Sequence, residues 1–322
     1  MTVTTFLVRL LVLAVIFING WTDAPNAIAT AVGSGSLTFR QGAALAAVGN
    51  FLGAAAACLL FPAVAATMGD LITFSGGDWA ALTALCAAML AILVWAVLAW
   101  RFGLPTSESH ALIAGLSGAA LALGSTVARM NGDAWAKVLA GLFISLLVGG
   151  LGGRWAAGWL KGRRCSAVTW QRIGAGVMAF LHGGQDGQKF MALLLMADGL
   201  GGMDAAPSLP LALLCACSMA LGTALGGKPI VEKVGTELTP LSPADGLAAD
   251  LGAGVCLLGC TLLGLPVSTT HTKVAAVCGV GLTRDRKGVA LRPVLEIAAA
   301  WALTFPACAG LAYLLTLMML PG

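Results

Sequence analysis

The chain alternates between long apolar stretches and short clusters of polar residues, glycine and proline. Stretches such as 80–100 and 293–320 reach the roughly 20 residues that an α-helix needs to cross a bilayer. The pattern predicts an all-α polytopic membrane protein with about ten crossings and two re-entrant hairpins. The apolar stretch after Arg9 has no small-residue cleavage site, so we interpret it as the first membrane helix and not as a signal peptide.

Composition agrees with a membrane setting. Hydrophobic residues make up 59% of the 322 residues and charged residues only 10%, whereas soluble domains carry about 25% charged residues. The nine cysteines include no C-x-x-C pair, which argues against disulfides or a metal cluster. We therefore expect a multi-pass protein of the cell inner (plasma) membrane, with the lipid bilayer as its surroundings.

Positive charges gather in two loops and form no face suited to nucleic acid, so no nucleic-acid partner is expected. The first cluster consists of Arg154, Lys161, Arg163, Arg164 and Arg172, and the second of Arg284, Arg286, Lys287 and Arg292. Lysine and arginine are enriched in cytoplasmic loops of membrane proteins. The first cluster is therefore expected on the cytoplasmic side.

The second half of the chain repeats the first. Residues 19–27 match 182–190, which places Asp23 over Asp186, and residues 103–121 match 264–282, which places His110 over His271. Between them, 48–54 match 221–227. We predict a first transmembrane repeat at 1–133, a connecting helix and basic loop at 134–172, and a second repeat at 173–322, within one membrane domain. Corresponding segments interrupted by glycine and proline are typical of a transporter with a site near the membrane midplane. An odd number of crossings between equivalent points makes the repeats inverted, and we favour inverted repeats with broken helices and re-entrant helical hairpins.

Each repeat contains a proline followed by hydroxyl residues and a histidine, at 105–110 and 266–271. Proline suits the first turn of a helix, and serine or threonine caps its free N–H groups. Helix starts inside a membrane offer backbone donors and a positive dipole end to an anion. The candidate ligands of a tetrahedral oxyanion are Ser107, Ser109, Ser268, Thr269 and Thr270. The alternative is ordinary helix capping at the membrane interface.

Two carboxylates lie in the repeated apolar segments, where a charge is costly and usually faces a cavity or a partner. Asn26 accompanies Asp23, and Gln188 and Lys189 accompany Asp186. Oxygen ligands of this kind suit sodium, while a carboxylate alone can carry a proton. Lys189 shares a helical face with Asp186. Its ammonium would take the place of a sodium ion, or form a structural Asp–Lys pair.

Three histidines and one glutamate also lie in or beside these segments. His110 and His271 are expected to fix the hairpins by bonding backbone groups in preference to carrying protons. His182 aligns with Asn19, which indicates a polar structural role. Glu108 corresponds to Thr269, and a carboxylate at an anion-binding helix start must be protonated, turned away or used for coupling.

These motifs resemble the duplicated signature of the PiT family of inorganic phosphate transporters. That family carries a G-x-N-D-x-x-N-type motif and a P-x-S-x-[ST]-H-type motif in each half. Here they stand at 20–26, 183–189, 105–110 and 266–271, and the resemblance covers roughly residues 15–310. It implies a cation-coupled phosphate symporter with its site between inverted repeats. By the same resemblance, the hydroxyl residues of the two helix starts would bind phosphate, and Asp23, Asn26 and Asp186 would bind phosphate and the coupling ion, sodium if it is used. The resemblance implies no cofactor besides a coupling ion, Na⁺ or H⁺, and it suggests a homodimer.

The sequence departs from this signature at the presumed coupling positions. The asparagine before each aspartate is replaced by Thr22 in one half and by Gln185 in the other, and Glu108 replaces a hydroxyl residue. Coupling to protons in place of sodium therefore stays open. An aspartate that touches the anion would favour phosphate, which can donate a proton, over sulfate.

Three alternatives remain at this point. The first is a sulfate or other oxyanion symporter of the same fold. The second is an intramembrane serine protease, because 115–118 read G-x-S-G around Ser117 and histidines could act as the base. The third is a passive channel or a receptor, to which buried carboxylates in both halves would bring no advantage.

Overall fold

The computed structural model describes residues 2–74, 78–162, 166–284 and 288–320. Arg163, Arg164, Arg286 and Lys287 of the predicted basic clusters lie outside these residues. The first part of the chain forms α1 (Val3–Thr22), η1 (Ala24–Ala27), α2 (Ala29–Gly33), α3 (Phe39–Leu60), α4 (Ala63–Gly69), β1 (Ile72–Phe74), α5 (Asp78–Arg101), α6 (Glu108–Leu123), β2 (Ala128–Met130) and α7 (Gly132–Leu160). The second forms α8 (Ala167–Leu200), α9 (Leu209–Leu225), α10 (Lys228–Glu232), η2 (Lys233–Glu237), α11 (Pro243–Leu262), α12 (Thr269–Gly281) and α13 (Leu291–Met319).

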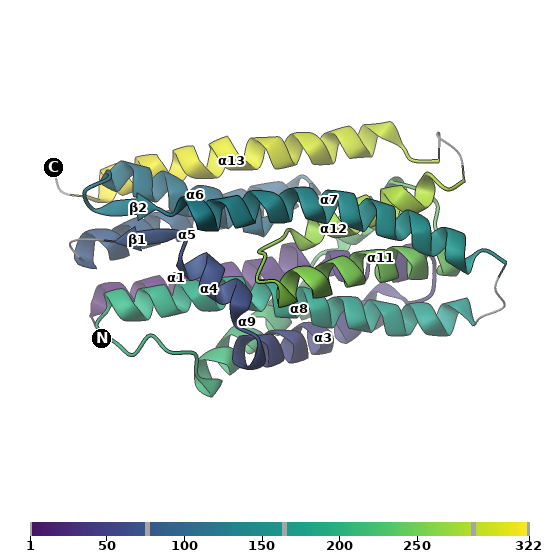
Figure 1. Ribbon diagram of the computed structural model, residues 1–322, viewed down its shortest axis with the longest axis horizontal. Helices are drawn as coiled ribbons and strands as arrows, with labels where there is room; N and C mark the ends of the chain where they lie inside the picture. Colours follow the sequence, from purple (N-terminus) through teal and green to yellow (C-terminus); the bar gives the residue numbers. More distant parts are fainter. Residues whose placement is uncertain (1, 75–77, 163–165, 285–287, 321–322) are drawn as a thin grey trace.

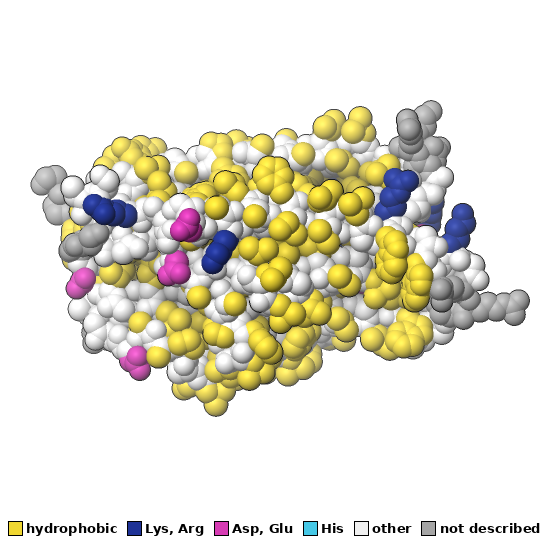
Figure 2. Space-filling view, in the orientation of Figure 1, with side chains coloured by type: hydrophobic (Ala, Val, Ile, Leu, Met, Phe, Trp, Pro, Cys, Tyr) yellow, Lys and Arg dark blue, Asp and Glu magenta, His cyan; other side chains and the backbone are white. Residues whose placement is uncertain are grey.

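The helices run side by side along the longest axis of the molecule (Figure 1). Within the described residues, six are long and apolar enough to cross a membrane, or seven if the bent pair formed by α9 and the segment 228–237 counts as one span. This number is below the expected ten for two reasons. The 34-residue α8 is long enough to cross but is too polar to count as an apolar span, and α2, α4 and α10 are too short to cross alone. Hydrophobic side chains cover the middle of the visible face, and the visible charged side chains lie toward the two ends (Figure 2).

The predicted inverted repeats with broken helices and re-entrant hairpins are present. The hairpin α5–α6 enters from the end that carries both chain termini and returns to it, whereas α11–α12 enters from the opposite end (Figure 1). Thus α6 and α12 begin in the middle and run in opposite directions. The described residues of both basic clusters lie toward the end of the molecule at which α7 and α12 finish.

Helices break where the sequence removes donors or requires unusual backbone. Pro25 lies in the first turn of η1, so α1 ends at Thr22 and the chain continues as a 3₁₀ turn. Phe61 and Pro62 separate α3 from α4. Gly226 and Gly227 separate α9 from α10, where the chain bends by 72° and Gly227 has a φ of +89°.

The two repeats are interleaved. Helix α1 packs on α9 as α8 packs on α3, and α6 packs on α13 as α12 packs on α7. The last correspondence makes α7 the counterpart of α13, and therefore the last helix of the first repeat, where the sequence suggested a connecting helix at 134–172. The predicted boundary after residue 172 falls inside α8.

Two features were not predicted. Strands β1 and β2 form a small antiparallel pair, with Thr73 opposite Arg129. The residue-by-residue correspondence between α3 and α9, which are equivalent helices of the two repeats, also differs from the sequence match of 48–54 with 221–227. A Cβ at Gly53 would lie 1.9 Å from the Phe180 carbonyl oxygen, and a Cβ at Gly222 would lie 1.9 Å from that of Phe17. Since Phe17 and Phe180 correspond, Gly53 corresponds to Gly222, one helical turn from the alignment by sequence.

Candidate functional site

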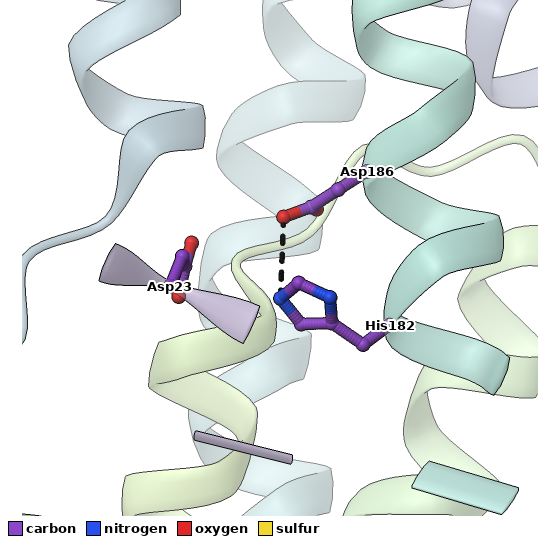
Figure 3. A group of neighbouring side chains, drawn as sticks. All are labelled: Asp23, His182 and Asp186. Atoms are coloured by element: carbon purple, nitrogen blue, oxygen red, sulfur yellow. Dashed lines mark ion pairs between the residues drawn. The ribbon is translucent and has the colours of Figure 1, made fainter. Parts of the chain in front are cut away.

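The two repeated aspartates meet in the interior. Asp23 caps the end of α1, and Asp186 lies in α8; each is 1% exposed. Ligand atoms of Asp23, Asp186 and His182 lie within 4.8 Å of one another (Figure 3). Corresponding residues of two inverted repeats approach each other in this way where the pseudo-twofold axis passes, so the site lies at the centre of the symmetry.

Asp186 has a full set of partners. The Lys189 ammonium lies 2.6 Å from its Oδ1, Asn19 Nδ2 donates to its Oδ2 at 3.1 Å, and His182 Nε2 lies 3.5 Å from Oδ2. The ammonium also donates to Ser109 Oγ at 2.7 Å and to the Val267 carbonyl oxygen at 2.6 Å. Three oxygens of different kinds therefore surround the buried ammonium, and they come from α8 and from both hairpins.

Asp23 has corresponding neighbours but no ammonium. Thr270, the counterpart of Ser109, donates to Asp23 Oδ1, and Asn26, the counterpart of Lys189, donates to the same oxygen at 3.1 Å. Asp23 Oδ2 and Asn26 Oδ1 are buried and have no hydrogen-bond partner among the described residues. Carboxylate, amide and hydroxyl oxygens with unused lone pairs fit a small hard cation.

Glu108 adds a third buried carboxylate. It is 2% exposed and stands in the first turn of α6. Its Oε1 accepts a hydrogen bond from Thr22 Oγ1 at 2.7 Å, while Oε2 has no partner in the described part of the chain. Within that part, neither Glu108 nor Asp23 forms an ion pair, in contrast to Asp186. Because a buried unpaired carboxylate is costly, the cluster needs added positive charge from protons or a metal cation.

Both predicted helix starts point into this cluster. Ser107 and Ser268 are the N-caps of α6 and α12, and their Oγ atoms accept from the backbone N–H groups of His110 at 3.4 Å and His271 at 3.1 Å. Thr269 Oγ1 is buried without a partner among the described residues. Two opposed N-termini with hydroxyl groups provide the donors that a tetrahedral oxyanion requires.

Four predicted residues have surroundings other than those expected. Gln188 accepts from the Val64 N–H at 3.0 Å and so caps the start of α4, and Gln185 Nε2 donates to the Leu265 carbonyl oxygen at 3.1 Å. The expectation of backbone bonds for the repeated histidines was wrong for His271, both of whose ring nitrogens lack partners in the described residues, and for Nδ1 of His110.

The histidine rings pack instead. The His110 and His271 ring centroids are 4.3 Å apart, and His271 lies 3.5 Å from the Trp301 ring. Trp301 Nε1 donates to the Pro105 carbonyl oxygen at 3.0 Å, so it also supports the tip of the first hairpin. The aromatic group therefore joins the two hairpin starts and α13 by contact between rings.

Sequence reasoning missed Asn50, Asp250 and Lys273, which are buried in the interior. His182 Nδ1 lies 3.0 Å from Asn50 Oδ1, which fixes the ring that faces Asp186. Lys273 pairs with Asp250 one turn beyond Thr270 on α12. A lysine within an apolar helix is itself a signal of function, and its position three residues after Thr270 places both side chains on one face.

Comparison with known proteins agrees with this architecture. The model of the "Phosphate transporter family" matches the chain twice, at residues 19–166 and 163–312. The protein belongs to this family. The two matches bear out the internal repeat, and the family consists of transporters, so the protein is not an enzyme and the protease alternative is wrong. Consistently, Ser117 Oγ donates to the Ile113 carbonyl oxygen of its own helix at 2.7 Å.

Individual relatives extend the similarity over nearly the whole chain. A probable low-affinity inorganic phosphate transporter of Bacillus subtilis is 32% identical over 96% of this chain and 95% of its own. One of Rhizobium meliloti is 34% identical over 91% of this chain and 90% of its own. A solved structure named the sodium-dependent phosphate transporter has the same fold, with a TM-score of 0.86 over 98% of this chain and 99% of its own, at 19% identity.

Proposed function

We propose that the protein is a secondary transporter that imports inorganic phosphate together with a cation, sodium or protons, by alternating access across the cell inner membrane. Two opposed helix N-termini supply anion donors, and three buried carboxylates lie beside them with one ammonium. This combination supports cation coupling because an anion and unpaired carboxylates share one buried site. The printed names of the bacterial relatives support phosphate as the anion.

Charge balance ties the anion to the cation. Asp186 is neutralised by Lys189. Asp23 and Glu108 have no basic partner within the described residues, so the arrival of phosphate would add negative charge to a negative site. A cation at Asp23, or protons on the two carboxylates, removes this repulsion. Phosphate binding then requires the coupling ion, which prevents uncoupled passage of phosphate.

Within this proposal the ammonium of Lys189 replaces one exchangeable cation. Its three oxygen neighbours are Asp186, Ser109 and the Val267 carbonyl. The corresponding group around Asp23 has Asn26 where the lysine stands. One repeat thus carries its cation permanently and the other binds it from solution. We propose one exchangeable cation position beside the phosphate.

Basic residues at the end that carries the loop 161–172 support a cytoplasmic location for that end, since the positive-inside rule counts lysine and arginine near the membrane. The site lies between this end and the end with both termini (Figure 1). Import would then proceed from the end with the termini, as one group of helices rocks against the other.

The test is uptake of radiolabelled phosphate into proteoliposomes, with sodium and proton gradients imposed separately and excess sulfate as competitor. We expect uptake driven by one gradient and unaffected by sulfate. Asp23→Asn should abolish coupled uptake, whereas Asp204→Asn, at an exposed position, should leave it unchanged. Uptake of sulfate in place of phosphate would replace the anion of the proposal, and uptake by Asp23→Asn at the normal rate would refute the coupling role.

A further inference from the structure

A second ammonium is buried outside the phosphate cluster. Lys273, on α12, is 1% exposed. It pairs with the Asp250 carboxylate of α11 and donates to Thr30 Oγ1 at 3.0 Å and to the Ala27 carbonyl oxygen at 3.5 Å. Thr30 also donates to Asp250 Oδ1 at 2.8 Å. The matching position in the first hairpin is the apolar Leu112, so the hairpin fold itself does not require this lysine.

The surroundings of Lys273 repeat those of Lys189 in kind. Each ammonium is held by one carboxylate, one hydroxyl and one backbone carbonyl, which are the oxygen donors that bind small hard cations in proteins. Asp250 Oδ2 is buried and has no hydrogen-bond partner among the described residues, so its lone pairs remain available to a ligand. We call the oxygens of Asp250, Thr30 and the Ala27 carbonyl the cage. A single carboxylate balances a single positive charge, so the cage suits a monovalent cation in preference to a divalent one.

The cage lies next to the Asp23 site. Thr270 contacts Asp23 and Asn26, and Lys273 follows it by one helical turn, while Ala27 and Thr30 follow Asn26 along the opposing segment. Since α12 runs from the middle of the molecule toward the basic end (Figure 1), the cage lies on that side of the cluster. The same two segments, η1–α2 and α12, thus line both positions.

We propose that Asp250, Thr30 and the Ala27 carbonyl form a second monovalent-cation site, which the ammonium of Lys273 occupies permanently. The lysine thereby prevents an ion from solution from binding between α2 and α12. Removal of the ammonium should leave a negatively charged cage that binds Na⁺, Li⁺ or K⁺. The proposal concerns binding at this cage and holds whichever anion or coupling ion the central site takes.

The experiment measures thermal unfolding of purified protein in NaCl, LiCl, KCl and choline chloride at equal ionic strength. All variants carry Asp23→Asn, so that the central site contributes little. Lys273→Met should show a midpoint that rises with the concentration of a metal cation, because a ligand bound only by the folded state stabilises it. The parent should lack this rise, and so should Lys161→Met, which removes an exposed lysine.

Adding Asp250→Asn to Lys273→Met should abolish the response while retaining a folded protein, since both charges of the pair are then absent. A response of Lys273→Met no larger than that of the parent, or one that survives Asp250→Asn, overturns the proposal. If Lys273→Met cannot be recovered in choline chloride, its recovery during extraction in a metal-cation salt supports the proposal. Failure to recover it in every salt, while the double variant is recovered, overturns it.

Discussion

The close contact of α3 with α8 permits a quantitative prediction. A Cβ at Gly53 would lie 1.9 Å from the Phe180 carbonyl oxygen, while real Cβ contacts essentially never fall below 3.0 Å. The variant Gly53→Ala therefore requires the helices to separate by about 1.1 Å (3.0 − 1.9) at this point. Phe180 precedes His182 and Asp186 on α8, so the same displacement shifts residues of the site.

Overpacking of this kind typically costs about 1–3 kcal/mol. We expect Gly53→Ala to lower the free energy of unfolding by that amount and to weaken phosphate binding. Gly222→Ala should behave alike, because its Cβ would meet the Phe17 carbonyl oxygen at the same distance. The control is Gly259→Ala in α11, where the added Cβ would have no described heavy atom within 4 Å apart from its chain neighbours and the adjacent backbone of its own helix. There alanine should be neutral or stabilise the helix by up to about 1 kcal/mol.

The assays are thermal unfolding in detergent and equilibrium binding of radiolabelled phosphate, on the three variants in parallel. If Gly53→Ala and Gly222→Ala are as stable as Gly259→Ala and bind phosphate equally well, the helices tolerate separation. The close glycine contacts would then play no part in placing the site.

Four further predictions concern side chains of the site and its surroundings. Lys189→Met should cost about 3–5 kcal/mol of stability in thermal unfolding because it leaves Asp186 buried without a cation, and adding Asp186→Asn should restore most of it; a cost below about 1 kcal/mol would contradict the ion pair. Lys189→Asn, which matches the other repeat, should make phosphate uptake depend more steeply on sodium concentration if sodium drives it, and an unchanged dependence would contradict the permanent-cation role. Glu108→Gln should flatten the pH dependence of phosphate uptake, because one titrating carboxylate is lost; an unaltered profile would exclude Glu108 from coupling. Ser117→Ala should leave uptake unchanged, since its hydroxyl bonds only its own helix.

The repeated motifs predicted the centre of the site well because they identify chemistry that apolar helices do not otherwise contain. Pairing of the two blocks brought Asp23 and Asp186 together, and it placed Ser109 and Thr270 at corresponding positions. It could not separate residues that bind from those that support the helices. Gln188 belongs to the aspartate motif at 183–189 of the second repeat. It nevertheless caps the start of α4, which is distant in sequence.

The remaining errors have a common physical origin. Helices rich in glycine, alanine and leucine match one another in several registers, and only the approach of the backbones selects one, as at Gly53 and Gly222. The partner of Lys273 lies on the other arm of its hairpin, and its remaining ligands come from the broken first helix. Periodicity within one helix carries no information about contacts of this kind.

The interleaving of the repeats determines the order in which the chain can fold. Helix α6 packs against α13, with Gly118 directly beneath the Ala309 carbonyl oxygen. During synthesis the first hairpin enters the membrane long before residues 291–319 exist, so the small-residue face of α6 must wait without its final partner. Helix α12 meets α7 immediately, since α7 is already in place. The second hairpin can therefore mature before the first, and newly made chains should be most exposed to proteolysis and to wrong helix pairing in the interval before α13 inserts.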